Sequence, residues 1–417
     1  MILQERETMN VIIIDDDASS RINGIGTYLK ALIGIFKRMG ARITRVGYSA
    51  SCKTFVVREE NGVRVMLLPP LPASCYFKIM DKFLGLYIKD AEENLFMLHY
   101  SPCDDLIRVL KKRFPLSKFT FTIHDMIWTA LLRGDAAKLK EIVTSGPKEG
   151  ELETYATVRK SFKAEQAMYA LVDAVIVLAR GTYRVLTDVY KIEPEKIYLI
   201  PNGLKDTYSP VSEDVKREIR ADKFLSEHEK ILLFAGRVHY MKGIHSLIRC
   251  FGQVLQAYPE CRLVIAGFVM DVPKVLSLTG DAASRIIFTG HIPKKELDKW
   301  LKITDIGVLP SYTEQCCYWG IELMMHRIPV ITTDGFNLTE MFMDGLNAGV
   351  AEIGHRGDTD RFEHNLSGEI VRLLRAEGEC RKLGAQGRLV YEKCYTAEIM
   401  YENYKKLTDA LFLKADK

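Results

Sequence analysis

The chain has 417 residues, of which 47% are hydrophobic and 27% charged, and its formal net charge is +4. This length is too great for one ordinary core and suits two domains of a globular protein. The small net charge argues against nucleic acid as a partner, and no apolar run reaches the roughly 18–20 residues that a membrane-spanning helix needs.

The first half of the chain alternates short apolar runs with helical stretches. The expected strands are residues 11–14, 95–99, 119–123, 174–178 and 197–200. After a turn-rich segment at 201–230, the alternation restarts with strands at 231–235, 262–266, 285–288, 307–309 and 329–332. Short apolar strands separated by helices predict an α/β fold with two doubly wound parallel sheets. Ligands of such sheets bind at the carboxyl ends of the strands.

The N-terminus and the cysteines bear on location. MILQERETMN lacks the basic-then-apolar order of a signal peptide. The nine cysteines include no Cys-x-x-Cys pair and no cluster at zinc spacing. We therefore expect reduced thiols and a cytoplasmic protein.

Two stretches, 18–58 and 106–124, are basic and contain no acidic residue. They are explained either by solvated helix faces or by contact with an anionic surface. The second interpretation allows peripheral contact with the inner face of the membrane.

Cations follow the strand at 231–235. Gly236-Arg237 end this strand, and Lys242-Gly243 open the next helix. Two cations beside a helix N-terminus suit a diphosphate. Taken alone, such a pattern is weak, and surface charges near a helix start explain it better.

Two carboxylates lie in the run PSYTEQCCYWGIE. Glu314 falls in the loop after 307–309, and Glu322 falls in an expected helix at 320–325. A carboxylate accepts paired hydrogen bonds from a vicinal diol, so Glu322 suits ribose hydroxyls and Glu314 suits sugar hydroxyls. The pair could also be the acid and base of a glycosidase, but the neighbouring cations favour hydroxyl binding.

These motifs carry a resemblance to a known family. Gly236-Arg237, Lys242-Gly243, P-S-x-x-E-x7-E, P-V-I-T-T-D-G and Glu340 occur in the order found in the C-terminal domain of retaining glycosyltransferases of family 4, which have the GT-B fold. In the first half, N-G-I-G-T-Y-L, T-I-H-D at 122–125 and I-P-N-G-L resemble other motifs of the family. The tail YTAEIMYENYKKLTDAL is similar to its closing helix.

The resemblance implies two Rossmann-like domains that face a cleft. The N-terminal, acceptor-side domain is 1–205, completed by the C-terminal helix at about 395–417, and the nucleotide-sugar domain is 206–394. The implied reaction moves a sugar from a nucleotide diphosphate sugar, with a UDP-sugar favoured and a GDP-sugar possible, to an acceptor hydroxyl with retention. The acceptor would be a glycan, a lipid-linked molecule or a peptide, and neither a metal nor another cofactor is implied.

The resemblance also implies roles for single residues. Arg237 and Lys242 would neutralise the departing diphosphate, Glu314 would hold the donor sugar, and Glu322 would hold the ribose. His124 would face the donor sugar from the first domain. The remaining nucleotide-sugar-binding positions are Gly24, Gly26, Gly236, Gln315, Cys316 and Cys317.

Three features leave alternatives open. Gln315-Cys316-Cys317 stand where the family has Gly-Phe-Gly, and the cysteines are either packing residues or a reactive thiol. Asp15-Asp16-Asp17 are either a polar turn with a helix cap or an Asp-x-Asp metal site. The segment 131–165 reads as an insertion that could set acceptor choice.

Other functions on the same fold also stay open. A nucleotide-sugar epimerase or an inverting transferase would need a carboxylate base. A regulatory subunit without activity would be supported only by the altered stretch at 315–317.

Overall fold

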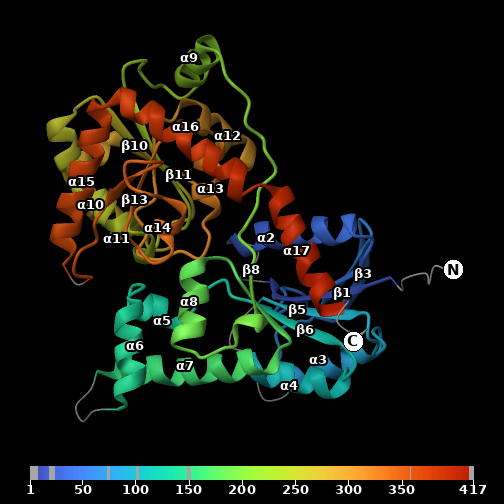
Figure 1. Ribbon diagram of the computed structural model, residues 1–417. Coiled ribbons are helices and arrows are strands. Elements are labelled where there is room, and N and C mark those ends of the chain that lie inside the picture. Colours follow the sequence, from blue (N-terminus) through green and yellow to red (C-terminus); the bar gives the residue numbers. More distant parts are fainter. Residues whose placement is uncertain are drawn as a thin grey trace. The chain divides into compact units, whose positions relative to one another are not determined.

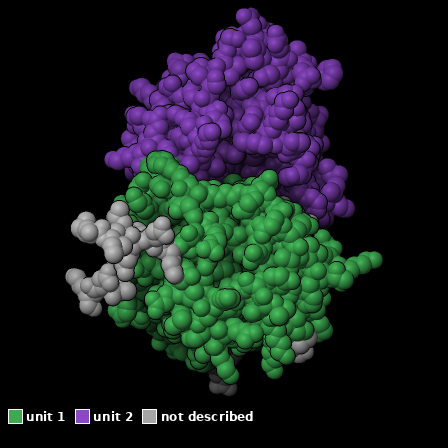
Figure 2. Space-filling view, turned by 90° about the vertical axis from the view of Figure 1, so that its right-hand side faces the viewer, with its two compact units in different colours: residues 1–128, 137–201, 398–417 green, residues 129–136, 202–397 purple. Residues whose placement is uncertain are grey.

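The computed structural model describes residues 8–17, 24–72, 76–99, 103–147, 152–356 and 358–412. The chain forms two compact units, which Figure 2 colours separately. Unit 1 contains residues 1–128, 137–201 and 398–417, and unit 2 contains residues 129–136 and 202–397. The chain thus leaves unit 1 after Pro201, and its last helix belongs to unit 1 again.

Unit 1 is built on a sheet of order β3-β4-β2-β1-β5-β6-β7-β8. Its strands are β1 (Asn10–Asp16), β2 (Arg42–Tyr48), β3 (Val56–Glu60), β4 (Val63–Leu67), β5 (Asn94–Leu98), β6 (Lys118–Thr122), β7 (Ala174–Val177) and β8 (Ile197–Leu199). All neighbouring strands are parallel except the antiparallel hairpin of β3 and β4.

Helices cover both faces of this sheet, as Figure 1 shows, with α2 and α17 on one side and α3, α4 and α7 on the other. The helices of unit 1 are α2 (Gly24–Arg38), α3 (Tyr76–Gly85), α4 (Asp104–Arg113), α6 (Ala136–Ser145), α7 (Glu153–Leu171), α8 (Arg180–Asp188) and α17 (Ala397–Phe412), while α5 (Ile127–Leu131) runs from unit 1 into residues 129–136. The closing helix α17 is held by an edge-on contact between Phe36 and Tyr404, 5.7 Å between centroids, and by an Arg38–Glu398 ion pair.

Unit 2 is built on a parallel sheet of order β11-β10-β9-β12-β13-β14. Its strands are β9 (Lys230–Ala235), β10 (Cys261–Ala266), β11 (Ile286–Gly290), β12 (Ile306–Val308), β13 (Val330–Thr333) and β14 (Gly349–Ala351). Its helices are α9 (Glu213–Asp222), α10 (Ile244–Ala257), α11 (Val272–Ser277), α12 (Lys294–Ile303), α13 (Tyr318–Met325), α14 (Leu338–Met341), α15 (Thr359–Arg375) and α16 (Glu377–Cys394).

Burial on both faces explains why unit 2 folds as a parallel sheet. Alternate residues of β9, Leu232 and Phe234, belong to a buried cluster with residues of α10 and α15. The residues that alternate with them, Ile231 and Leu233, are buried as well. A strand that is apolar on both faces needs helices on both sides, so the predicted fold of two doubly wound sheets is confirmed.

The interpretation of Asp15–Asp17 as a polar turn is wrong. Strand β1 continues through Asp16, and the side chains of Asp15 and Asp17 are buried. Arg45 of β2 donates to Asp15 at 3.0 and 2.8 Å and to Asp17 at 2.9 Å. A buried carboxylate is stable when a cation and hydrogen bonds compensate it, and Arg45 gives this compensation from the neighbouring strand.

Carboxylates distant in sequence neutralise part of both basic stretches. Arg38 pairs with Glu398, and Arg45 pairs with Asp15 and Asp17. In the second stretch, Lys111 lies 3.6 Å from Asp173, and Arg113 lies 3.4 Å from Asp81. These pairs favour solvated faces over an anionic-surface contact. None of the described helices is long and apolar enough to cross a membrane.

Candidate functional site

The carboxyl ends of β9 and β12 bring the predicted diphosphate residues together. Strand β9 ends at Ala235, and the 3-10 turn Tyr240–Lys242 leads through Gly243 into α10. Gly243 has φ 64°, and a Cβ there would lie 1.7 Å from the carbonyl oxygen of Pro310. Only glycine lets the start of α10 approach the segment after β12 this closely.

Lys242 and Glu314 form an ion pair at this junction. The Lys242 Nζ lies 2.6 and 2.8 Å from the two carboxylate oxygens of Glu314, and the Ser311 hydroxyl donates to the same carboxylate at 2.8 Å. Burial lowers the pKa of Lys242, but the Glu314 carboxylate outweighs it, so the net pKa is raised and the ammonium stays charged. Residues predicted to hold different parts of a donor are therefore partners of each other in the structure.

Arg237 differs from Lys242 in that it forms no ion pair with any residue that the structure describes. Gly236 and Arg237 are both exposed at the end of β9. Within the described residues, no carboxylate forms an ion pair with Arg237, so its guanidinium is available to an anion. Before any ligand binds, Lys242 is therefore in an ion pair, whereas Arg237 is exposed to solvent.

Glu322 has a cation that sequence reasoning missed. Its carboxylate on α13 lies 3.0 Å from the Nζ of Lys294, which also pairs with Asp298 at 2.9 Å. Burial raises the pKa of Glu322, and Lys294 partly offsets this rise. Lys294 opens α12 after Pro293, in the run HIPKKELD that follows β11. A strand end followed by Pro and lysines is the signal that could have pointed to it.

The Gln315–Cys317 stretch is packed rather than reactive. Gln315 and Cys316 are buried, and the carbonyl oxygen of Cys316 accepts a 2.6 Å hydrogen bond from the Asn202 amide. Burial raises the pKa of the Cys316 thiol well above its usual range and that of Cys317 to about 12. Both thiols stay protonated near neutral pH, so the reactive-thiolate alternative is not supported.

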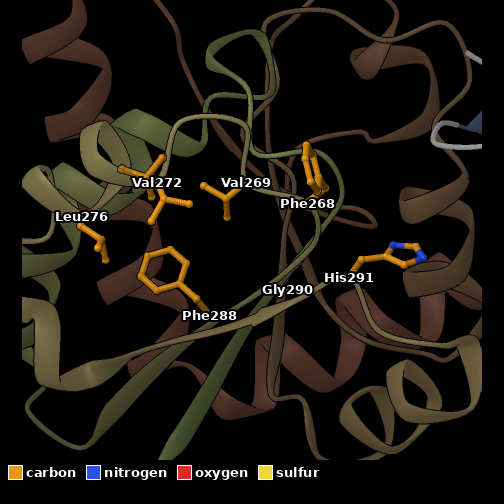
Figure 3. Close-up of a pocket in the computed structure, with 8 residues that line it drawn as sticks. Phe268, Val269, Val272, Leu276, Phe288, Gly290 and His291 are labelled. Atoms are coloured by element: carbon orange, nitrogen blue, oxygen red, sulfur yellow. The ribbon is translucent and has the colours of Figure 1, made fainter.

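An apolar pocket lies next to these loops, at the carboxyl ends of β10 and β11. Its volume is about 300 Å³, and it is lined by Phe268, Val269, Val272, Val275, Leu276, Phe288, Gly290 and His291. Figure 3 shows side chains of Val269, Val272, Leu276 and Phe288 converging on one space, with the His291 imidazole directed away. This pocket was not expected from the sequence.

In unit 1, His124 follows β6 and lies, partly buried, beside His99 and Tyr28. Its Nε2 lies 3.3 Å from Nδ1 of His99, which follows β5, so one ring donates and the other accepts. The Tyr28 ring meets His124 edge-on at 4.6 Å. Gly24 and Gly26, predicted in a loop, lie in the first turn of α2, and the preceding 18–23 fall outside the described residues.

A second buried group holds the chain just after His124. The Glu165 carboxylate on α7 accepts a hydrogen bond from the backbone N–H of Ile127 at 3.2 Å and another from the Tyr190 hydroxyl. Burial raises the pKa of Glu165 to about 6. Glu165 thus fixes the start of α5, which the sequence did not indicate.

We predict that kcat/KM shows no histidine inflection near pH 6.5. Burial lowers the pKa of His124 to about 3 and that of His99 well below its usual range, so both rings stay neutral at physiological pH. Since the unfolded chain binds protons that the folded one excludes, stability should fall as pH drops below roughly 6.5. A pH–rate profile checks this; an inflection in the wild type that His124→Gln removes would contradict it.

Comparisons with known proteins agree with this geometry. Residues 215–389 match the family model described as glycosyl transferases group 1. The D-inositol 3-phosphate glycosyltransferase of Xylanimonas cellulosilytica is 24% identical over 370 residues, 82% of either chain. The alpha-monoglucosyldiacylglycerol synthase of Streptococcus pneumoniae is 28% identical over 252 residues, which cover 58% of this chain and 52% of that protein.

Solved structures match the fold over nearly the whole chain. Sucrose-phosphate synthase from Thermosynechococcus elongatus superposes with a TM-score of 0.73 at 20% identity, covering 98% of this chain and all of that one. Anabaena HepE in complex with UDP and glucose gives a TM-score of 0.69 at 13% identity, covering 96% of this chain. With its two doubly wound units and the loops that follow β9 and β12, the chain has the GT-B fold, and residues 215–389 are similar to the glycosyl transferases of group 1.

Proposed function

We propose that the protein transfers a sugar from a nucleotide diphosphate sugar, with a UDP-sugar favoured, to an acceptor hydroxyl with retention of configuration. The observation that carries this proposal is the order of groups along one sheet edge. Neighbouring strands are about 4.8 Å apart, and the order β11-β10-β9-β12 sets the apolar pocket, then Arg237 and Lys242, then Glu314, side by side. A base, a diphosphate and a sugar follow one another in the same order in the donor.

Each group suits the part of the donor assigned to it. The apolar pocket at β10 and β11 would take the face of the base. Glu322, already paired with Lys294 beside this pocket, would accept the ribose hydroxyls. An ammonium has three N–H donors, so Lys242 would keep Glu314 while it binds a phosphate oxygen. Lys242 and Ser311 already donate three hydrogen bonds to Glu314, so one of its roughly four lone-pair sites, on Oε2, would be left for a sugar hydroxyl.

The reaction would need no protein nucleophile. The bond between the sugar C1 and the phosphate oxygen breaks as the acceptor oxygen bonds to C1 on the same face. The acceptor proton passes to the departing phosphate. Arg237 and Lys242 would stabilise the charge on that phosphate where it develops, and His124, neutral in the folded protein, would offer the sugar a hydrogen bond.

Relatives support the donor class and leave the acceptor open. HepE has been solved with UDP and glucose, and the two relatives above are named for inositol 3-phosphate and for the glycolipid monoglucosyldiacylglycerol. We propose a glycan, a lipid-linked molecule or a peptide as the acceptor. The order of the motifs along the chain argues against an epimerase, and the turnover measurement below distinguishes an enzyme from a subunit without activity.

A panel of nucleotide sugars tests the proposal. Turnover of UDP-glucose, UDP-N-acetylglucosamine and GDP-mannose would be measured with and without hydroxyl acceptors. We expect release of free UDP from at least one UDP-sugar, increased by an acceptor. Binding without turnover of any of them would favour the regulatory subunit.

We also predict that excess EDTA leaves this turnover unchanged. The two cations would already supply the leaving-group charge, and Arg45 occupies the carboxylates of Asp15 and Asp17. In the part of the chain that the structure describes, no three acidic, histidine or cysteine residues are grouped as metal ligands. Loss of activity with EDTA, restored by Mn²⁺ or Mg²⁺, would refute metal independence.

A further inference from the structure

A short segment of the N-terminal half of the chain belongs to unit 2. Residues 129–136, here called the arm, are compact with unit 2, whereas residues up to 128 and from 137 belong to unit 1. The arm makes a tight turn in which Arg133 has φ 48° and Gly134 has φ 73°. Left-handed backbone at a non-glycine residue is uncommon and persists only where its surroundings hold it. The function proposed above does not use the arm.

Gly134 lies directly against Tyr312 and Thr313, which precede Glu314, and against Phe336. A Cβ at this position would be 2.8 Å from the Cβ of Phe336, 3.0 Å from the carbonyl oxygen of Tyr312 and 3.2 Å from the Cβ of Thr313. Such distances leave no room for a side chain. The close approach, and not only the turn, therefore requires glycine.

Arg133 adds polar contacts to the same surface. Its guanidinium donates to the carbonyl oxygen of Arg356, and the guanidinium of Arg356 donates back to the carbonyl oxygen of Arg133. Arg356 also reaches the carbonyl oxygen of Tyr312 at 3.4 Å, and the Arg133 guanidinium lies 5.3 Å from the centre of the Tyr312 ring. Both arginines thus converge on Tyr312.

Tyr312 and Phe336 form the backbone support of Glu314. The N–H of Tyr312 donates to Met241, next to Lys242, at 3.0 Å. The N–H of Phe336 donates to Tyr312, and the N–H of Glu314 donates to Phe336, both at 3.1 Å. A displacement of Tyr312 or Phe336 would therefore move Glu314 and change its distance from Lys242.

We propose that Arg133 and Gly134 are positioning residues that hold the carboxylate of Glu314 in place for the donor sugar. The arm would not contact the donor sugar or the acceptor. It would act on Glu314 through Tyr312 and Phe336. The assignment rests on the proposed function for the role of Glu314. The packing on which it depends can be tested separately.

The test compares Gly134→Ala with Gly62→Ala. Gly62 has nearly the same backbone, φ 72°, but nothing within 4 Å of an added Cβ, so it controls for backbone strain alone. Hydrogen exchange of the amides of Glu314 and Phe336 should accelerate about tenfold or more in Gly134→Ala and stay unchanged in Gly62→Ala. Equal exchange in both variants would overturn the proposal.

Binding separates positioning from a general loss of structure. With UDP and UDP-glucose as calorimetric probes, Gly134→Ala should keep UDP affinity within about twofold and lower kcat/KM by about ten- to a hundredfold. Added to E314Q, it should cost little more, because both changes act on one group. Full additivity would overturn the positioning role. If E314Q alone had no effect on the sugar nucleotide, the proposed role of Glu314 would fail, while the exchange data would still decide whether the arm holds the loop.

A second variant covers the case in which Gly134→Ala does not fold. Arg133→Ala adds no volume and removes only the contacts to Arg356 and Tyr312. It should accelerate the same amides and lower kcat/KM in the same direction by a smaller factor. Unchanged exchange and unchanged kcat/KM in this variant would also refute the proposal.

Discussion

Replacing Lys242 with alanine is expected to lower kcat/KM for the sugar nucleotide by roughly a hundredfold or more. The change removes a charge-assisted bond to the diphosphate, worth about 1.5–3 kcal/mol. It also leaves the Glu314 carboxylate, whose side chain is only 9% exposed, without its cation. Both losses act on the same step, so we expect the largest effect of any single substitution in unit 2. Steady-state kinetics and calorimetry with UDP would measure it.

Arg237→Ala and Lys295→Ala are the matched controls for this prediction. Arg237 is exposed and has no ion-pair partner among the described residues, so its loss should weaken UDP without lowering the melting temperature. Lys295 is exposed beside Lys294 and forms no ion pair with a described residue. Its loss should therefore change neither the UDP affinity nor the melting temperature. Lys242→Ala should weaken UDP and also lower the melting temperature. Unchanged UDP affinity in both Lys242→Ala and Arg237→Ala would remove the diphosphate site from the model.

The architecture of the sheets was predictable from apolar runs because buried parallel strands must be apolar on both faces. Strands β2, β3, β4 and β14 were missed. β3 is largely exposed, and β2 contains Arg42 and Arg45, so neither of these two strands forms an apolar run. The hairpin nevertheless had a recognisable turn, Asn61-Gly62, whose φ values of 50° and 72° are those of a two-residue hairpin loop.

Site residues were predictable by type but not by pairing. A strand end with Gly-Arg and Lys-Gly, and two glutamates after a later strand, identify the loops that meet at one sheet edge. The sequence does not tell which cation takes which carboxylate, because Lys242–Glu314 and Lys294–Glu322 are set by the order of strands in the sheet. The same limit explains the error at Asp15 and Asp17, whose partner Arg45 lies on the neighbouring strand.

The arm could not be predicted from sequence at all. Arg133 and Gly134 lie in a turn within a segment that reads as an insertion, and their contacts to Tyr312, Phe336 and Arg356 join residues more than 170 positions apart. Neither propensity nor periodicity carries information about such contacts. The role of the arm depends on how closely Gly134 approaches Tyr312 and Phe336, and this distance is known only from the folded chain.

Replacing Glu314 or Glu322 with glutamine keeps the side-chain volume and removes the charge. The two variants should differ in their affinity for UDP. Glu322→Gln should weaken UDP and UDP-glucose equally, by roughly ten- to a hundredfold, because a charged hydrogen bond to the ribose is lost from both. Glu314→Gln should lower kcat/KM by a similar factor through the sugar. This variant should bind UDP more tightly than the wild type, because Lys242 is released from its ion pair and its full charge becomes available to the diphosphate.

Calorimetry with UDP therefore distinguishes the two roles by sign. Stability separates them as well: Glu314→Gln leaves the half-buried Lys242 without its partner, whereas Glu322→Gln leaves Lys294 with Asp298. We expect a lower melting temperature in the first variant and a small change in the second. If both variants weakened UDP alike, the two carboxylates would share one role. The assignment of Glu314 to the sugar would then be wrong, although the strand order would still place both ion pairs at the same edge of the sheet.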